Sequence, residues 1–225
     1  MGYSNLSVRA ASEADMPSIN EIFNSARAFM VAQGNPQWQD GFPDNNFLCA
    51  ALAGGNLRVV CCGGRVAAVY SVFYEDADYN DIDGYWLTDN AKNSDTKTAE
   101  KYNFESADDN QDVNFVQKSS DNKSLNNIIT VPNKVSDVCV QTTECSYIAV
   151  HTVAVDSSFR GMGIAKFCLG SAEAECIKAG RGSIRMDTHV CNTPMQKLLS
   201  ACGFVCCGKL KARGNGSFLC YEKLV

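Results

Sequence analysis

Residues Arg160 to Ala165 (RGMGIA) form the segment whose residue types point most directly to chemistry. Two glycines, Gly161 and Gly163, follow Arg160 and its permanently charged guanidinium group. Glycine lets the backbone approach a ligand closely because it carries no side chain. If a helix begins here, its first N–H groups have no acceptor within the helix and favour an anion. The segment therefore predicts a phosphate or pyrophosphate site.

The elements that must position this segment are a strand before it and a helix after it. Tyr147–Val155 (YIAVHTVAV) is a short apolar run rich in β-branched residues, which is typical of a buried strand. From Ile164 onward apolar residues recur at mainly helical spacing until Ala179-Gly180. A strand, a glycine turn and a helix could hold a dinucleotide on a Rossmann unit, and Asp187 ends the next predicted strand as that unit requires. However, Lys166 stands where the third glycine belongs, and the upstream half predicts a hairpin rather than further β-α-β units. The alternative anion is the pyrophosphate of coenzyme A.

The rest of the pattern predicts a single domain over residues 1–225, of the α/β class, with a mixed sheet and helices on both faces. Strands are expected near residues 6–10, 57–62, 65–74, 147–155, 183–189, 204–207 and 217–224, and helices near residues 12–33, 46–53, 164–179 and 192–203. Between about residues 88 and 143 Asn, Asp, Ser, Lys and Thr dominate without a sustained apolar period. We expect an insertion there, either mobile or held by a small hairpin near residues 126–131.

Composition excludes several classes of protein. The net charge of −5 argues against non-specific nucleic-acid binding, which needs a basic face. No apolar run approaches the roughly 20 residues of a membrane span, and the N-terminus lacks a signal-peptide core, so a cytoplasmic location is expected. The 12 cysteines contain no C-x-x-C pair, and only two histidines accompany them. We therefore expect no metal site, and thiols that are mostly buried in a reducing compartment.

The sequence resembles the GNAT acetyltransferase superfamily. The resemblance is carried by Arg160-x-x-Gly163-x-Ala165, by the preceding Val153-Ala154-Val155, and by the later Asn192 and Gly203-Phe204. More narrowly, three segments look like a group of small bacterial-type GNAT proteins of largely unassigned substrate: Gln33 to Trp38, Asp187 to His189, and Asn192-x-Pro194-Met195-Gln196. The resemblance implies a GNAT-like fold with mostly antiparallel N-terminal strands and a central β-α-β unit.

The resemblance implies acetyl-CoA as the co-substrate, without a metal. Backbone N–H groups would hold its pyrophosphate beside Arg160, and they belong to Gly161, Met162, Gly163, Ile164 and Ala165. The strand edge at Val153, Ala154 and Val155 would pair with the pantetheine arm. Asn192 would bond that arm or help to orient the thioester, or it would only cap the following helix.

Two histidines are the candidate catalytic residues, since acetyl transfer needs a base that accepts a proton from the amine. His151 stands where many family members carry a Glu, and its ordinary pKa of about 6.5 suits it to accept a proton at neutral pH. His189, at the end of the neighbouring predicted strand, is the second candidate. His151 could instead only fill a strand face. Leu199 stands where family members often place a Tyr that protonates the leaving thiolate. Either Tyr147, Tyr221 or water would then donate that proton, or the thiolate would leave without a general acid.

The acceptor pocket is expected on aromatic loops, at Trp38, Tyr85 and Trp86. Acidic residues near positions 75–83 would suit an amine, although a solvated acidic loop is the simpler interpretation. The favoured function is an acetyl-CoA-dependent N-acetyltransferase acting on a primary amine of a small molecule or peptide, by direct attack on the thioester. The alternatives are a silent acyl-CoA-binding module or sensor and, less favoured, a dinucleotide enzyme. The sequence predicts neither nucleic acid nor membrane as a partner, and it leaves a homodimer open.

Overall fold

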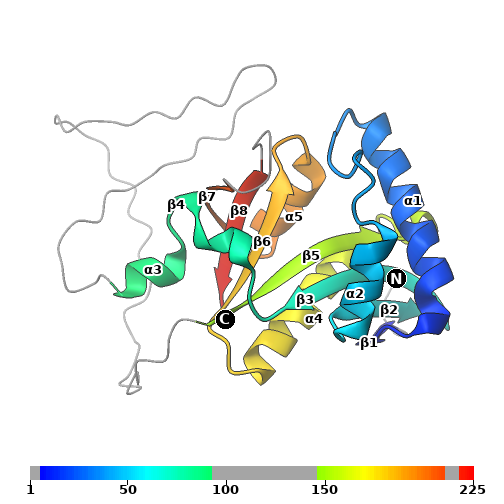
Figure 1. Cartoon of the computed structure of the whole chain (residues 1–225), viewed down its shortest axis with the longest axis horizontal. Coiled ribbons are helices and arrows are strands. Elements are labelled where there is room, and N and C mark those ends of the chain that lie inside the picture. Colours follow the sequence, from blue (N-terminus) through cyan, green and yellow to red (C-terminus); the bar gives the residue numbers. More distant parts are fainter. Residues whose placement is uncertain (1–5, 93–145, 211–217) are drawn as a thin grey trace. The chain divides into compact units, whose positions relative to one another are not determined.

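The structure is a computed structural model that describes residues 6–92, 146–210 and 218–225. Within these ranges eight strands form one sheet in the order β1-β2-β3-β5-β6-β8-β7-β4 (Figure 1). The strands are β1 (Leu6–Ala10), β2 (Leu57–Cys62), β3 (Arg65–Phe73), β4 (Ile82–Gly84), β5 (Tyr147–Val155), β6 (Ser183–His189), β7 (Val205–Leu210) and β8 (Phe218–Leu224). The helices are α1 (Met16–Ala32), α2 (Asn45–Ala53), α3 (Leu87–Lys92), α4 (Ile164–Lys178) and α5 (Thr193–Ala201), with short 3-10 turns at Glu13–Asp15, Ala77–Asn80 and Ser157–Phe159.

The sheet is mixed, as predicted. Of the strand pairs in the described residues, β5 with β6 is parallel and all others are antiparallel. Helix α4 connects the two parallel strands, which makes the expected central β-α-β unit. The predicted insertion near residues 88–143 lies outside the described residues apart from its first part, where Leu87–Lys92 form α3.

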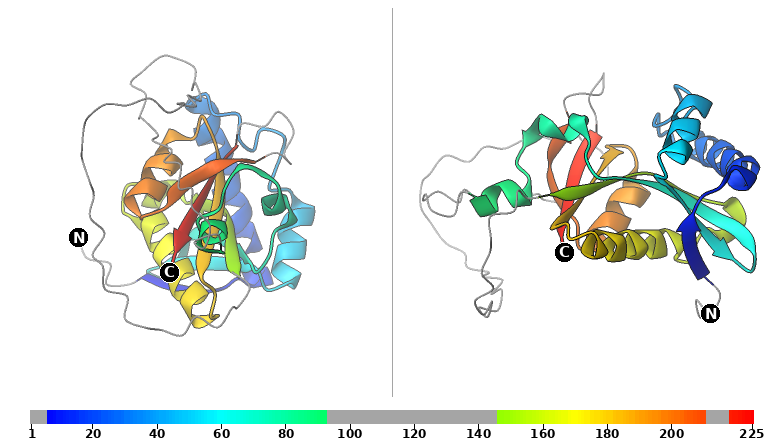
Figure 2. Two further views of the ribbon diagram at one scale, coloured as in Figure 1. Left: turned by 90° about the vertical axis from the view of Figure 1, so that its left-hand side faces the viewer. Right: turned by 60° about the horizontal axis from the view of Figure 1, so that its bottom comes forward.

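Helices cover both faces of the sheet, and each face has its own core (Figure 2). On one face α4 and α5 pack Cys168, Leu169 and Leu199 onto the strands. On the other face α1 and α2 bury their apolar stripes against β2 and β3, with Phe23 and Leu48 among the fully buried side chains. Among the helices that the structure describes, none combines the length and apolar character that a membrane crossing requires.

The far edge of the sheet contains elements that the sequence analysis treated as an acidic loop. Strand β4 pairs with β7, and Gly84 faces Gly208 across that pair. A Cβ at either glycine would collide with the backbone of the other strand, so the close approach requires glycine on both sides. Tyr79 and Trp86, on either side of β4, are buried in a third apolar cluster with Ala149.

The centre of the sheet opens between β5 and β6. Their parallel ladder covers only Tyr147–Ala149 against Ser183–Arg185, after which β5 follows β3 and β6 follows β8. A β-bulge lies just past the point of separation, because the register against β3 shifts between Val69 and Ser71. Thr152 occupies the bulge with a φ of 54°, and its hydroxyl lies 2.9 Å from that of Ser71. The divergence leaves room for a ligand in the middle of the sheet.

The cysteines within the described ranges are all free thiols. Several lie in the core, and burial raises the pKa of Cys168 and of Cys207 to about 12. Such thiols remain protonated at neutral pH and act as small apolar side chains.

Candidate active site

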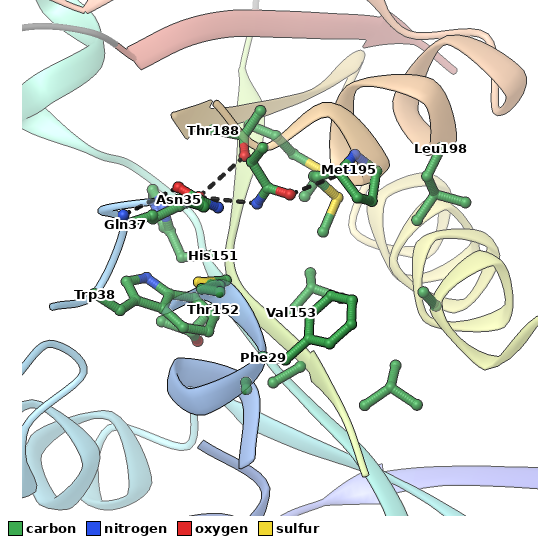
Figure 3. Close-up of a pocket in the computed structure, with 18 of the residues that line it drawn as sticks. Phe29, Asn35, Gln37, Trp38, His151, Thr152, Val153, Thr188, Met195 and Leu198 are labelled. Carbon is green, nitrogen blue, oxygen red and sulfur yellow. Dashed lines mark hydrogen bonds between the residues drawn. The ribbon is translucent and has the colours of Figure 1, made fainter. Parts of the chain in front are cut away.

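A cavity of about 270 Å³ lies where β5 and β6 separate (Figure 3). Its walls come from α1, from the loop between α1 and α2, from the second half of β5, and from the end of β6 with the start of α5. The lining residues are Ala26, Phe29, Met30, Gln33, Asn35, Gln37, Trp38, Phe42, Val150, His151, Thr152, Val153, Ala154, Val155, Arg160, Ala165, Met186, Asp187, Thr188, Cys191, Asn192, Pro194, Met195 and Leu198. Segments that are far apart in the sequence therefore meet around one space.

One end of the cavity is made by β5 and the turn into α4. The edge of β5 at Val153–Val155 faces the gap, where the described sheet has no neighbouring strand. Gly161 and Gly163 have φ values of 75° and 77°, and Gly163 is the residue from which α4 begins. In the left-handed region a Cβ costs about 1–2 kcal/mol, so these glycines allow the turn to expose the N–H groups at the start of α4. Arg160 lies beside them and donates a hydrogen bond to Ser25 Oγ at 3.0 Å. The segment for which the sequence predicts an anion site therefore lies at a helix N-terminus beside the cavity.

Not every residue of the predicted phosphate segment reaches the cavity wall. Arg160 and Ala165 line the cavity, whereas the side chain of Met162 is half exposed and that of Ile164 is buried in the core under α4. This placement agrees with a role for the backbone of Gly161–Ala165 rather than for its side chains.

His151 lines the other end of the cavity, between two carboxylates. Its Nε2 lies 2.7 Å from Asp76 Oδ2, and its Nδ1 lies 3.5 Å from Asp187 Oδ1. The hydroxyl of Tyr79 donates a hydrogen bond to the same Asp187 oxygen at 2.9 Å. The side chains of His151 and Asp187 are only 10% and 3% exposed, so the imidazole is held in place and largely shielded from water. We call His151, Asp76 and Asp187 the His151 cluster.

The two carboxylates determine the charge of the imidazole. Burial alone would lower the pKa of His151, because the charged form loses its hydration. Hydrogen bonds and charge from Asp187 and Asp76 act in the opposite direction and prevail, so the pKa of His151 is raised above its ordinary value of 6.5. The group can thus carry a proton near neutrality while it remains in contact with the cavity.

His189 does not lie in the cavity. Its Nδ1 accepts a hydrogen bond from the backbone N–H of Cys191 at 3.1 Å, and its ring meets that of Phe218 edge to face at 5.3 Å. Burial lowers the pKa of His189. Of the two candidate histidines, the structure brings only His151 to the cavity wall.

Asn192 joins the start of α5 to the loop between α1 and α2. Its Oδ1 accepts a hydrogen bond from the backbone N–H of Met195 at 3.3 Å and thereby caps α5. Its Nδ2 donates to Gln37 Oε1 at 2.9 Å (Figure 3). Asn192 thus caps the helix and lines the cavity at the same time, so the two roles considered for it are compatible.

The predicted acceptor aromatics divide into one that lines the cavity and two that do not. Trp38 lines the cavity and packs its ring edge to face on Phe23 at 5.6 Å. Tyr85 is 64% exposed, and Trp86 is buried, donating to the carbonyl of Tyr79 and stacking under the guanidinium of Arg185. The structure places Tyr85 and Trp86 at the β4 edge of the sheet, so neither reaches this cavity.

Three residues outside the predicted catalytic, cofactor and acceptor residues contribute to the site: Gln37, Asp76 and Asp187. Asp187 lies near the end of a predicted strand, but the sequence suggests a role for it only in the dinucleotide alternative and does not pair it with His151. Asp76 was one of several acidic residues in a loop, and nothing in the sequence pairs it with His151 across 75 positions. Gln37 is separated from Asn192 by 155 positions and has no local signal either.

Part of the sequence matches a known protein family. Residues 137–204 match the sequence model of the Acetyltransferase (GNAT) family. Over these residues the chain is similar to that family. No curated protein matches the sequence.

Solved structures of GNAT proteins share this fold. A GNAT-family acetyltransferase from Streptococcus agalactiae is 22% identical with a TM-score of 0.65, over 98% of this chain and 95% of that one. A GNAT-family acetyltransferase from Listeria monocytogenes is 16% identical with a TM-score of 0.58, over 98% and 95%. A ribosomal-protein-alanine N-acetyltransferase from Brucella melitensis is 17% identical with a TM-score of 0.53, over 97% and 99%. At these identities the likeness establishes the fold, which confirms the predicted α/β class and GNAT-like architecture.

Leu199, on the inner face of α5, is fully buried and does not line the cavity. No tyrosine is among the described residues that line the cavity. Tyr147 exchanges hydrogen bonds with the backbone of Asp76, and burial raises the pKa of Tyr221 to about 12. Neither of the two tyrosines considered as proton donors therefore stands at the cavity wall.

Proposed function

We propose that this protein is an acetyl-CoA-dependent N-acetyltransferase that acetylates a primary amine by direct attack on the thioester. The observation that carries the proposal is the separation of β5 from β6, which joins the α4 turn and the His151 cluster in a single cavity. A donor with an anionic pyrophosphate and an acceptor with an ammonium group would each find groups of opposite charge there. One of the solved structures with this fold is named an N-acetyltransferase, which supports nitrogen as the first acceptor atom to test.

The residues at the α4 end fit coenzyme A. Arg160 and the N–H groups at the start of α4 would hold the pyrophosphate, since a helix N-terminus with an adjacent guanidinium favours phosphate oxygens. The edge of β5 at Val153–Val155 that faces the gap would hydrogen-bond the amides of the pantetheine arm, in the way that a sheet edge binds an added strand. Bound in this way, acetyl-CoA supplies the activated acetyl group.

The His151 cluster would manage the proton. A primary amine arrives as an ammonium ion, and the nearby carboxylates of Asp76 and Asp187 favour a cation. His151, when neutral, accepts the proton that the amine releases. The amine lone pair then forms the new N–C bond at the thioester carbonyl, and the C–S bond breaks with its electron pair on sulfur.

The leaving thiolate needs no tyrosine in this scheme. A thiol with a pKa near 8.5 is a fair leaving group, so the thiolate can depart and take a proton from water. The absence of a tyrosine from the described cavity lining is nevertheless the observation that favours a second candidate, a silent acyl-CoA-binding module. A dinucleotide enzyme has little support, because the described sheet contains one parallel strand pair rather than a series of β-α-β units.

Two measurements test the proposal. Calorimetry with acetyl-CoA, CoA and NAD identifies the ligand, and binding of NAD alone would refute the assignment. A panel of primary amines incubated with acetyl-CoA, with release of free thiol as the readout, then separates an enzyme from a sensor. Binding of acetyl-CoA without amine-dependent thiol release would favour the silent module.

A further inference from the structure

We propose that Gln37 determines which amines are accepted, by donating a hydrogen bond from its side-chain Nε2 to a carbonyl oxygen next to the reacting amine. The preferred acceptor would then be an α-amino carbonyl compound, such as an amino-acid amide or the N-terminal residue of a peptide. This inference rests on the proposed function and assigns the acceptor class for the same cavity.

Gln37 is a buried amide at the cavity wall. It lies in the loop between α1 and α2, and it is only 9% exposed although it lines the cavity. The backbone N–H of Gln37 donates a hydrogen bond to Asn35 Oδ1 at 3.0 Å. This bond fixes the loop at the point from which the Gln37 side chain extends. The side chain then reaches across the open end of the sheet toward Thr188 (Figure 3).

The oxygen of this amide is fully engaged. Gln37 Oε1 accepts from Asn192 Nδ2 at 2.9 Å, from the hydroxyl of Thr188 at 3.3 Å and from the backbone N–H of His189 at 3.4 Å. These donors come from the end of β6 and the start of α5. Gln37 therefore ties one wall of the cavity to the opposite wall through a single oxygen atom.

The same contacts establish which end of the amide is nitrogen. The backbone N–H of His189 can only donate, so it requires an oxygen at that end of Gln37. Asn192 Oδ1 accepts from the backbone of Met195, which turns the NH₂ group of Asn192 toward Gln37. Reversing the Gln37 amide would place donors against donors, and its NH₂ group must point the other way.

That NH₂ group has no acceptor among the residues that the structure describes. Gln37 Nε2 is not among the described buried side-chain atoms that lack a partner, so it keeps an accessible face. A donor that is accessible at a cavity wall can bind a ligand oxygen. Gln37, His151 and Asp187 all line the same cavity, so one ligand can meet the free donor and the His151 cluster. In a cavity of about 270 Å³, a ligand with its ammonium at the cluster and an oxygen at Gln37 is one that carries the two groups on a small skeleton, as an α-amino carbonyl compound does.

The charge of the cavity selects a neutral oxygen. Asp76 and Asp187 already place two carboxylates around one imidazole. A third carboxylate from a free amino acid would be repelled, whereas the carbonyl oxygen of an amide or peptide bond would not. We therefore expect amino-acid amides to be better acceptors than the corresponding free amino acids.

The test compares matched amines across variants of the full chain. Each amino-acid amide is paired with the amine that lacks its carboxamide: phenylalaninamide with 2-phenylethylamine, leucinamide with 3-methylbutylamine, and alaninamide with ethylamine. Gln37→Glu keeps an oxygen that accepts from Asn192, Thr188 and His189, but it replaces the donating NH₂ group with a second oxygen. Gln37→Leu removes both the accepting oxygen and the donating NH₂ group. Gln39→Glu, on the same loop and exposed, adds the same charge. It removes the bonds that Gln39 donates to the backbone oxygens of Gln37 and Arg27 but leaves the side-chain amide of Gln37 in place, so it controls for both charge and loop disturbance. The readout is the ratio of kcat/KM within each pair, in which the intrinsic reactivity of each amine cancels when variants are compared.

We expect the amide-to-amine ratio to fall by about tenfold or more in Gln37→Glu and Gln37→Leu and to stay unchanged in Gln39→Glu. The wild type should also prefer phenylalaninamide to phenylalanine. Equal losses for both members of every pair would overturn the proposal, because the donor would then serve the thioester rather than the acceptor. An unchanged ratio in Gln37→Glu overturns it as well, while leaving the acetyltransferase assignment intact. Absence of amine-dependent thiol release with every amine in the panel would refute the proposed function itself, and this inference with it.

Discussion

The two ends of the cavity are built in different ways. At the α4 end, the protein groups that we propose to bind the donor come from one continuous stretch, from β5 through the glycine turn into α4. Most of these proposed groups belong to the backbone. At the other end they are side chains from the α1–α2 loop, from the segment after β3, and from β5, β6 and α5. The first end is a local structure, whereas the second exists only when distant segments are folded together.

This difference suggests a division of tasks. A backbone site depends on φ and on helix geometry, so it tolerates side-chain change but not the loss of a critical glycine. A site of side chains can change its chemistry through single substitutions while the fold remains. We expect the α4 end to determine the donor and the other end to determine proton transfer and acceptor choice.

The sharpest test of this division is His151→Ala. Loss of a general base costs about 10²–10⁴-fold in rate, so we expect kcat to fall by that amount while the affinity for acetyl-CoA stays the same. Thiol release with an active amine measures the first quantity and calorimetry the second. The matched control is His189→Ala, since His189 lies outside the cavity and should leave kcat nearly unchanged. If the two variants lost the same activity, the role of His151 as the base would be refuted.

The α4 end is tested by Gly163→Val. A β-branched residue is strained at the φ of 77° and narrows the approach to the helix N-terminus. We expect the affinity for acetyl-CoA to weaken by about tenfold or more, which calorimetry would measure. Gly170→Ala is the control, because Gly170 lies inside α4 with open space around its Cα and should gain up to about 1 kcal/mol of stability. Unweakened binding in Gly163→Val would count against a backbone anion site.

The pH dependence of catalysis reports on the carboxylates around His151. The base must be neutral to act, and its pKa is raised by Asp187 and Asp76, so kcat/KM should rise with pH through a limb above 6.5. Asp76→Asn removes one of the two carboxylates and should move that limb to lower pH. A limb at the same pH in wild type and variant would contradict the pairing of Asp76 with His151.

The same shift has a consequence for stability. A group whose pKa is higher in the folded chain binds its proton more tightly there, so the proton favours folding. The contribution of His151 should be fully present below its unfolded pKa of about 6.5 and should be lost as pH rises through the raised folded value. Urea unfolding of wild type and Asp76→Asn across this range should show a smaller pH dependence in the variant.

The smallest effect is expected at Asn192, where the two ends meet. Asn192→Ala should lower the free energy of unfolding by about 1 kcal/mol through loss of the α5 cap. Asn192→Asp keeps an oxygen for the cap but removes the amide that donates to Gln37. We expect Asn192→Asp to retain stability and to bind acetyl-CoA or the acceptor several-fold more weakly. Wild-type binding and turnover in Asn192→Asp would assign Asn192 to the cap alone.

Much of the fold could be predicted because it is encoded by local patterns. Strand Tyr147–Val155, the glycine turn and helix Ile164–Lys178 each follow from short-range periodicity and from glycine positions. The β4 edge was missed because Ile82–Gly84 is only three residues long and sits within acidic neighbours. Its pairing depends on Gly208, more than a hundred positions away, and no local pattern reports such a contact.

The sequence by itself determined the glycine turn and the helix start that we propose as the anion site, since these residues are contiguous and their conformation is local. It also supplied His151 as the first candidate base, with His189 as the second. Only the tertiary structure decided between them, because it is the separation of β5 from β6 that brings His151 to the cavity and leaves His189 beside Phe218. The structure likewise decided the partners Asp76, Asp187 and Gln37, because contacts between distant side chains arise from packing, which sequence spacing does not encode.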